Sequence, residues 1–373
     1  MNSIHFIIET EQNKGLGHLI RCINFYQQIA HYLKDTQVYF FTFGNHFIPL
    51  NKEINSKQIA HRHFNNLENA IIEIRQSNLE YHLVDRQTRL NQWLIFDLDF
   101  KRAVLLADFI SFCKPHFVTI GFYNHLNKII DLPLDVHVNS LLLEEDKLNE
   151  KFKKKETLIL NGFQFRIFSN EFIKLYNKKS KISNTGNKIN FLVIAGNTDP
   201  QNRIQPILQI IKDLTKKEHF STNLSFHIIH SKDKNGMKFD EIKYKITDKV
   251  EIVNYTHLNQ QELIKLYAKI NFAITAVGST FWELDYLNIP CLLIPGSLTE
   301  DETALWLQNN KMAERLISVQ ENFNQTHFTK ISSWINTKIS NFKSNSGPLH
   351  SLSHSSLESG SVQIYQSIKS YLS

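Results

Sequence analysis

The sequence predicts an α/β fold with two doubly wound, Rossmann-like domains that face one another across a cleft. A chain of 373 residues is too long for one small core, so its length favours two domains. Short apolar runs alternate with amphipathic segments, as they do in parallel sheets with crossover helices. A polar stretch over residues 169–188 interrupts this alternation, which then starts again.

The first half opens with a strand, a glycine-containing loop and a helix. Residues Ile4–Glu9 form an apolar run, and apolar side chains recur at helical spacing over His18–Leu33. Further strands are predicted at residues 38–43, 81–85, 93–96 and 117–120, and another strand or its exit at residues 136–143. We therefore assign residues 1–168 to the N-terminal domain.

The second half repeats this organisation after a predicted helix and linker over residues 169–188. Strands are predicted at residues 190–195, 225–230, 250–253, 271–275 and 290–294, and helices at residues 204–214, 259–267 and 281–287. Residues 189–343 therefore form the predicted C-terminal domain. Residues 344–373 are expected to be a flexible loop rich in Ser, Gly and His, followed by an amphipathic helix from residue 362 to 372.

Charge and cysteine content argue against several functional classes. The chain carries 42 Lys and Arg against 36 Asp and Glu, and its short Lys-rich runs lack interleaved aromatic residues, so we expect no nucleic-acid partner. Cys22, Cys113 and Cys291 lie far apart, which argues against a disulfide framework and a Cys-based zinc site. With no signal-peptide pattern and no apolar run of about 20 residues, we expect a cytoplasmic protein without stable membrane insertion. Peripheral contact with an anionic membrane surface stays open.

The first glycine loop leads directly to a histidine. Gly15 and Gly17 lie where the first strand passes into the first helix, and glycines there let backbone amides approach a ligand. His18 falls in the first helical turn, with Arg21 one turn later on about the same face. This is the sheet edge where open α/β folds bind ligands, and a histidine there would act as a general base. The alternative is that His18 caps the helix or is merely exposed.

A second loop, Gly196-Asn197-Thr198, again lies between a strand and a helix. Its amides and the Asn197 and Thr198 side chains would hold phosphate oxygens. Asp199 and Pro200 also suit a helix start, with Asp as the cap and Pro at the first helical position. For this loop taken alone, the structural interpretation is the preferred one.

A third turn, Gly278-Ser279-Thr280, also joins a strand to a helix, so its amide and hydroxyl groups are expected to bind a diphosphate. Glu283 is suited to accept the paired hydroxyls of a ribose or sugar, or alternatively to interact with the helix dipole. The acidic helix start at residues 300–302 is explained by capping and dipole effects, and we expect no metal there.

In this order, the segments GLGHLIR, AGNTDP and AVGSTFWELDYLNIP, with TALWL following, resemble one family closely. That family is the nucleotide-sugar hydrolase of the pseudaminic-acid pathway, the UDP-diacetamido-trideoxy-altropyranose hydrolases. The resemblance runs over roughly residues 4–320 and includes a weaker match at Gly162–Phe172. The family is similar in turn to glycosyltransferases of the GT-B fold, including the one that adds N-acetylglucosamine to lipid-linked muropeptide.

The resemblance implies hydrolysis of a UDP-linked amino or deoxy sugar, which releases UDP and a free sugar for surface glycans of the nonulosonic-acid type. It implies that His18 activates water at the anomeric carbon from the N-terminal domain. It also implies that the C-terminal domain binds the nucleotide sugar, with the helix N-termini at Gly196 and Gly278 stabilising the departing UDP and Glu283 contacting the ribose or sugar. No cofactor or metal is implied.

Three features depart from the family pattern. The loop at residues 9–14 places its acidic residues differently, Asp85 is followed by Arg-Gln where the family has His-Tyr, and Ala195 replaces the first glycine of the second loop. These changes leave open the sugar and the acceptor, and sequence does not address the oligomeric state. Transfer of the sugar from a UDP donor to a glycan or lipid acceptor is the alternative activity. A non-catalytic nucleotide-sugar sensor or assembly subunit is a third reading.

Overall fold

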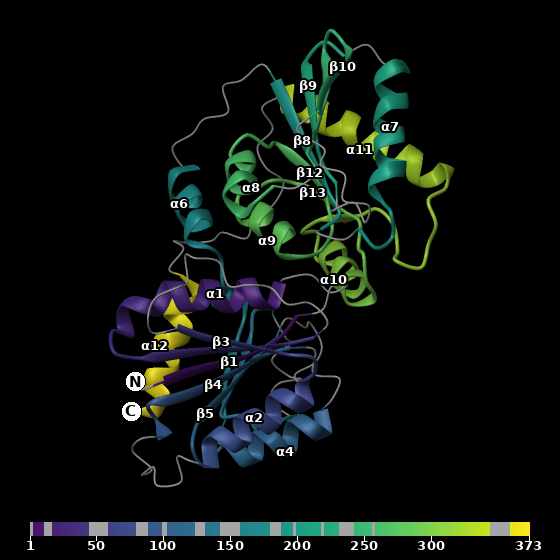
Figure 1. The fold of residues 1–373 in the computed structure, drawn as a ribbon. Helices are drawn as coiled ribbons and strands as arrows, with labels where there is room; N and C mark the ends of the chain where they lie inside the picture. Colours follow the sequence, from purple (N-terminus) through teal and green to yellow (C-terminus); the bar gives the residue numbers. More distant parts are fainter. Residues whose placement is uncertain are drawn as a thin grey trace. The chain divides into compact units, whose positions relative to one another are not determined.

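The computed structural model describes residues 3–10, 17–44, 59–79, 89–98, 103–123, 131–141, 157–179, 188–196, 199–217, 220–230, 242–255, 258–343 and 359–373. The chain divides into two compact units. The first comprises Met1–Asn170 together with Glu358–Ser373, and the second comprises Glu171–Leu357. Each unit holds its own sheet with helices on both faces, which confirms the predicted α/β class with two Rossmann-like units (Figure 1).

The first unit is built on a seven-stranded sheet with the order β3-β2-β1-β4-β5-β6-β7. Every neighbouring pair in it is parallel. Its strands are β1 (Ser3–Glu9), β2 (Gln37–Phe43), β3 (Ile59–Phe64), β4 (Gln92–Asp97), β5 (Val118–Tyr123), β6 (Val136–Asn139) and β7 (Leu158–Asn161). Its helices are α1 (Gly17–Ile29), η1 (Ala30–Tyr32), α2 (Leu67–Leu79), α4 (Ala103–Cys113), η4 (Phe163–Phe165) and α12 (Gly360–Leu372).

Apolar side chains cover both faces of this sheet, because a parallel sheet is buried on each side. Strand side chains alternate between faces, so Phe6 of β1 joins the core beneath α1 and α12, whereas Ile7 joins the core beneath α2 and α4. Figure 1 shows the two helix layers on opposite faces of the sheet.

The last helix, α12, belongs to the core of the first unit although it is the end of the chain. Ile364 and Ile368 are fully buried in one cluster with Trp93 of β4. The start of α12 requires a glycine, because a Cβ on Gly360 would lie 2.1 Å from the carbonyl oxygen of Arg166. The helix expected as part of a separate tail therefore completes one face of the N-terminal sheet.

The second unit is built on a seven-stranded sheet with the order β10-β11-β9-β8-β12-β13-β14. Only the β10–β11 pair is antiparallel in this sheet as described. Its strands are β8 (Lys188–Ile194), β9 (Asn223–Ile229), β10 (Ile242–Thr247), β11 (Val250–Tyr255), β12 (Phe272–Thr275), β13 (Cys291–Leu293) and β14 (Glu314–Arg315). Its helices are α6 (Asn170–Lys179), α7 (Ile204–Lys217), α8 (Gln260–Tyr267), α9 (Ser279–Tyr286), α10 (Leu298–Asn309) and α11 (Gln325–Lys343).

Helices α7 and α11 cover one face of this sheet, where they share a core with β8, β9 and β11. Helices α8 and α9 lie over the other face (Figure 1). The start of α8 is fixed by a capping box, in which Asn259 accepts from the Glu262 amide and Glu262 accepts from the Asn259 amide.

Several elements differ from the sequence-based expectation. The structure adds elements that the apolar pattern does not predict, namely β3, α2, α4, β7, β10, β14 and α11. Helix α9 begins at Ser279, two residues before the predicted start. Helix α7 begins at Ile204 as predicted, so the alternative in which Pro200 is its first residue is wrong. The predicted strand at residues 81–85 and residues 344–358 of the predicted loop lie outside the described residues.

Candidate active site

In the first unit, two neighbouring strands bring a histidine, an arginine and an aspartate together. Strand β4 pairs with β1 and ends at Asp97, while α1 begins shortly after β1 and carries His18 and Arg21 in its first turns. Nδ1 of His18 lies 2.5 Å from Oδ1 of Asp97. Nε of Arg21 donates to Oδ2 of Asp97 at 2.7 Å, and its Nη2 donates to Oδ1.

Asp97 is an anion without access to solvent, since its side chain is fully buried. Burial alone would raise the pKa of this carboxyl, but the charges and hydrogen bonds of Arg21 and His18 outweigh burial and hold the pKa below its ordinary value. The carboxylate in turn raises the pKa of Arg21 against the opposing effect of burial. The result is a buried ion pair that fixes both first-turn side chains of α1.

The charge of Asp97 assigns the tautomer of His18. An ionised carboxylate accepts hydrogen bonds only, so Nδ1 of His18 carries the proton and donates it to Asp97. The 3.2 Å approach of Arg21 Nη2 to the same Nδ1 is then a contact between two donors and not a hydrogen bond. In the neutral imidazole the lone pair then belongs to Nε2, and the side chain of His18 is 27% exposed, so an external group can reach it. This arrangement suits a general base.

Asp97 is the functional candidate that sequence reasoning missed. The available signal was the run WLIFD, in which a charged residue ends a strand whose preceding residues are apolar on both faces. Cys22 also contacts this carboxylate, with Sγ 3.5 Å from Oδ2. Burial and Asp97 raise the pKa of the Cys22 thiol, so it stays neutral and is no nucleophile.

Of the glycine pair before His18, Gly15 lies outside the described residues. Gly17 is the exposed first residue of α1, and a Cβ there would meet no described atom within 4 Å.

In the second unit, the Gly196 loop acts in part as a helix start. Gly196 has φ +78°, a conformation that favours glycine, whereas Asn197 and Thr198 lie outside the described residues. The Asp199 carboxylate accepts from the amides of Arg203 and Ile204 at 2.8 and 3.1 Å. Asp199 thus caps the start of α7, as the structural interpretation predicts. It lies further before the first helical residue, Ile204, than that interpretation placed it.

Gly278 is the N-cap residue of α9, with Ser279 and Thr280 as its first two residues. A Cβ on Gly278 would meet no atom within 4 Å. The first amides of a helix have no intrahelical partner, and they carry the positive end of the helix dipole. The Gly278 turn therefore offers a ligand the amides that bind anions.

Glu283 lies one turn further along α9 and is 9% exposed. Its Oε2 accepts a hydrogen bond from the Tyr267 hydroxyl at 3.0 Å. Burial raises the pKa of Glu283 to about 7, and the Tyr267 hydrogen bond opposes this rise. The carboxylate is therefore costly to keep charged, which is typical of a group that expects a further partner.

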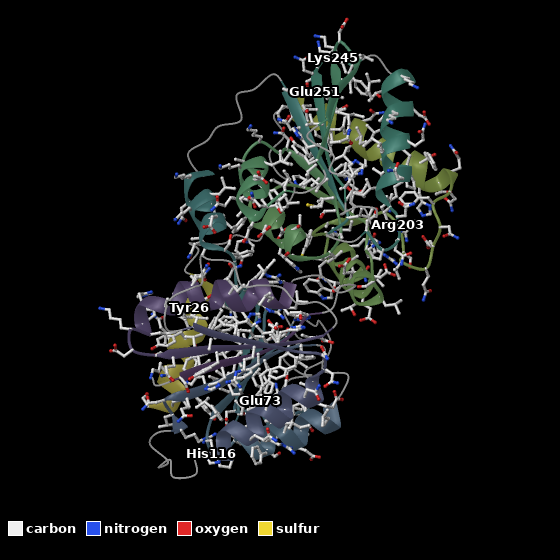
Figure 2. The ribbon with its side chains drawn as sticks, viewed as in Figure 1. Tyr26, Glu73, His116, Arg203, Lys245 and Glu251 are labelled. Carbon is white, nitrogen blue, oxygen red and sulfur yellow. The ribbon has the colours of Figure 1, made fainter. Side chains whose placement is uncertain are left out.

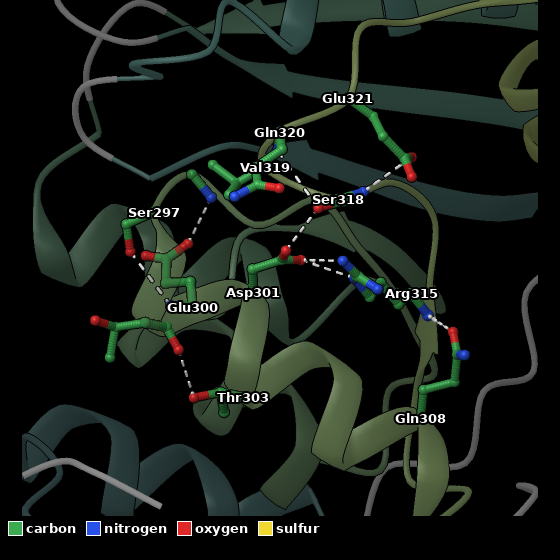
Figure 3. Close-up of polar contacts among 12 residues, drawn as sticks. Ser297, Glu300, Asp301, Thr303, Gln308, Arg315, Ser318, Val319, Gln320 and Glu321 are labelled. Carbon is green, nitrogen blue, oxygen red and sulfur yellow. Dashed lines mark hydrogen bonds and ion pairs between the residues drawn. The ribbon is translucent and has the colours of Figure 1, made fainter.

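The next helix start is tied to the Gly278 turn through Glu300, one of the acidic residues of α10. Ser297 caps α10 by accepting from the Glu300 amide, and the Glu300 carboxylate reaches back to the Gly296 amide at 2.8 Å (Figure 3). It also accepts from the Val277 amide, and burial raises its pKa. Glu300 thus joins two adjacent turns at the carboxyl edge of the sheet.

Asp301 of the same helix forms an ion pair rather than a dipole interaction alone. It accepts from Arg315 Nε at 2.7 Å and from the Ser318 hydroxyl at 2.7 Å (Figure 3). The buried Arg203, labelled in Figure 2, donates to the carbonyl oxygens of Ser318 and Glu321 and so fixes the loop after β14. Among the described residues, no group of three or more side chains is arranged to hold a metal ion.

Comparisons with known proteins support the fold. No family model matches the chain. Among curated proteins, an uncharacterized protein of Methanocaldococcus jannaschii is 24% identical over 302 residues, which cover 78% of this chain and 55% of that protein. The chain thus spans about half the length of the curated relative it matches.

Among solved structures, a putative UDP-N-acetylglucosamine 2-epimerase from Listeria monocytogenes aligns with a TM-score of 0.60 and 10% identity, covering 99% of this chain and 96% of that one. A UDP-GlcNAc 2-epimerase from Neisseria meningitidis bound to UDP-GlcNAc aligns with a TM-score of 0.57 and 13% identity, covering 99% and 100%. A UGT transferase from Siraitia grosvenorii in complex with UDP aligns with a TM-score of 0.56 and 9% identity, covering both chains fully at 100%.

These similarities establish a GT-B-like fold with two Rossmann-like α/β units, as predicted. At such identities the likeness is one of architecture, and a shared fold does not by itself assign a role to any residue. No described helix is both long and apolar enough to cross a membrane.

Proposed function

We propose that this chain binds a UDP-linked sugar and hydrolyses it to UDP and the free sugar. The observation that carries the proposal is the hydrogen bond between Asp97 and Nδ1 of His18, which leaves Nε2 able to take a proton. The fold supports the substrate class, because proteins that share it are solved with UDP-GlcNAc and with UDP.

In this mechanism the first unit supplies the base. Nε2 of His18 removes a proton from water as the water oxygen attacks the anomeric carbon. Asp97 keeps the imidazole in the required tautomer and stabilises the imidazolium that forms, as the carboxylate of a catalytic triad does. Arg21 holds Asp97 in place and keeps it ionised.

The second unit binds the nucleotide and stabilises the leaving group. As the bond between the anomeric carbon and the diphosphate oxygen breaks, its electron pair leaves with UDP. The amides of the Gly278-Ser279-Thr280 turn and of the loop at Gly196 stabilise this growing charge. Glu283 accepts hydrogen bonds from the ribose hydroxyls. Its carboxylate is unsuited to phosphate, because both groups are anionic.

We further propose that the sugar is an amino or deoxy sugar, destined for surface glycans of the nonulosonic-acid type. The motif resemblance to the pseudaminic-acid hydrolases supports this assignment. Residues 9–14 and 85–87 depart from the pattern of these hydrolases, so the sugar itself is the first variable to test.

Sugar transfer is the second candidate. It is favoured by the fold, because a UGT transferase that shares it is solved in complex with UDP. In this case Nε2 of His18 would take its proton from an acceptor hydroxyl in place of water.

The two candidates separate in one experiment. The full chain is incubated with a panel of UDP sugars, and released UDP is measured with and without glycan or lipid acceptors. Hydrolysis predicts acceptor-independent release, with oxygen from ¹⁸O-labelled water in the sugar and none in UDP. Release only with an acceptor would identify a transferase, and a new UDP-sugar epimer without release would identify an epimerase.

Site variants test whether the measured reaction uses the proposed residues. His18→Ala should abolish release while UDP still binds, whereas Glu283→Gln should weaken UDP binding. Full activity of both variants would overturn the site assignment.

A further inference from the structure

The hydroxyl of Tyr267 connects two residues of the proposed nucleotide site. Tyr267 is the last residue of α8, and its side chain is fully buried. Its hydroxyl donates to Oε2 of Glu283 at 3.0 Å and also forms a hydrogen bond with the Thr280 side chain. One phenol from α8 therefore holds two side chains on the first turns of α9.

The direction of these hydrogen bonds follows from the donors available. A phenol has one proton, and an ionised carboxylate requires it, so Tyr267 donates to Glu283 and accepts from the Thr280 hydroxyl. Thr280 therefore offers a ligand its backbone amide, because its hydroxyl proton is already used. Thr280, Tyr267 and Glu283 form a chain in which each donates to the next.

In the part of the chain that the structure describes, Oε1 of Glu283 has no such side-chain donor. Among the described residues, the Tyr267 hydroxyl is the side-chain donor that contacts Glu283, and burial is the main influence on its ionisation. Glu283 as a residue is only 9% exposed, and a carboxylate in such surroundings is stabilised by a further hydrogen-bond donor. A ribose hydroxyl supplies one, whereas a phosphate would add a second negative charge.

We propose that Tyr267 is a positioning residue for nucleotide recognition, which holds Oε2 of Glu283 so that Oε1 is presented to a ribose hydroxyl. This inference rests on the proposed function, since it takes the ligand to be a uridine nucleotide. It adds that discrimination between ribose and deoxyribose depends on a residue outside the turn that binds the diphosphate.

The charged groups around this chain of hydrogen bonds are few in the described structure. Burial raises the pKa of Tyr267 most, and the charges of Glu283 and of Cys291 in β13 add to this rise. Burial also raises the pKa of Cys291, where Asp285 of α9 adds to the rise and Lys338 of α11 opposes it. Tyr267 lowers the pKa of Glu283, opposing burial. Removing the phenol hydroxyl should therefore raise the pKa of Glu283. The pH midpoint at which UDP affinity changes should rise with that pKa.

The test compares UDP with 2′-deoxy-UDP, binding each to the full chain by calorimetry between pH 6 and 8.5. Wild type should prefer UDP by about tenfold, as the loss of one charge-assisted hydrogen bond predicts. Tyr267→Phe should reduce this preference to about twofold and shift the pH midpoint of UDP affinity upward. Glu283→Gln should abolish both the preference and the midpoint.

Tyr286→Phe is the matched control, because it also removes a phenol hydroxyl from a buried tyrosine in α9 but leaves the Tyr267–Glu283 hydrogen bond in place, and it should behave as wild type. Thr280→Val tests the chain from its other end and should shift the midpoint upward by a smaller amount. If it does, the inference stands even where Tyr267→Phe folds poorly.

Two failures are distinguishable. If wild type binds neither nucleotide, the proposed function and this inference both fall. If Glu283→Gln loses the preference but Tyr267→Phe and Thr280→Val keep the wild-type preference and midpoint, the proposed function survives and the positioning role of Tyr267 is refuted.

Discussion

His18 and Asp97 are hydrogen-bonded at 2.5 Å although 79 positions separate them in the chain. The parallel pairing of β1 with β4 creates this contact, because it brings the end of one strand beside the helix that follows the other. The same topology is what concentrates ligand sites at the carboxyl edge of open α/β sheets.

Asp97→Asn should lower kcat for UDP release by about a thousandfold, because an amide no longer fixes the Nδ1 tautomer and the imidazolium loses its anion. KM should change much less, since the proposed nucleotide contacts lie in the other unit. Steady-state kinetics with the preferred UDP sugar measure both values. Cys22→Ala is the control, because Cys22 contacts the same carboxylate only through a weak thiol donor. A wild-type kcat for Asp97→Asn would exclude the dyad.

The class of fold was predictable because both sheets are buried on each face. The runs at β1, β2, β8 and β12 are mostly apolar, and glycines follow each of these strands. Strand β3 was not predictable in the same way. It is an edge strand with the sequence IAHRHF, whose histidines and arginine remain partly exposed. Its place comes from pairing with β2, which is a tertiary effect.

The site was predictable only where its residues lie close together in sequence. His18 with Arg21, and Gly278 with Glu283, fall within single helical turns of a recognisable loop. Asp97 and Tyr267 are joined to these residues by strand pairing and helix packing. The run WLIFD marks Asp97 as an unusual charged residue, but nothing local to either residue identifies its partner. Sequence therefore yielded the groups proposed to touch a ligand but not the groups that hold them.

Glu283 should make the second unit less stable as pH rises. Its pKa in the folded protein is about 7 against an ordinary 4.5, so the folded state binds the proton more tightly than the unfolded state. The stability is fully present below pH 4.5 and is lost as pH rises through 7, by roughly 3 kcal/mol. The free energy of unfolding is measured in urea at pH 5 and pH 8, without nucleotide. Relative to wild type, Glu283→Gln should be more stable at pH 8 than at pH 5. Equal pH dependence of both proteins would contradict the burial of a charged carboxylate.

His5 should sensitise the first unit to acid. It lies on β1, stacked on Tyr39 at 4.6 Å, and burial lowers its pKa from 6.5 to about 3. The neutral form is therefore favoured in the folded state, and its stability is lost as pH falls from 6.5 towards 3, by up to about 5 kcal/mol. His5→Phe keeps an aromatic ring but has no group to protonate. Its free energy of unfolding should therefore fall less than that of wild type between pH 6.5 and 3. Ser3→Ala removes the hydrogen-bond partner of His5 but keeps the imidazole, so its free energy of unfolding should fall as much as that of wild type.

Asp199 separates capping from ligand binding in the second glycine loop. It has φ +37°, and its carboxylate accepts from the two amides at the start of α7. Asparagine tolerates this backbone conformation and can still accept from an amide, whereas alanine can do neither. Asp199→Ala should therefore lower unfolding stability by about 1–2 kcal/mol, and Asp199→Asn by clearly less. If Asp199 acts as a cap alone, UDP affinity measured by calorimetry should be unchanged in Asp199→Asn. A variant that is as stable as wild type but has lost UDP binding would assign the carboxylate to the ligand instead.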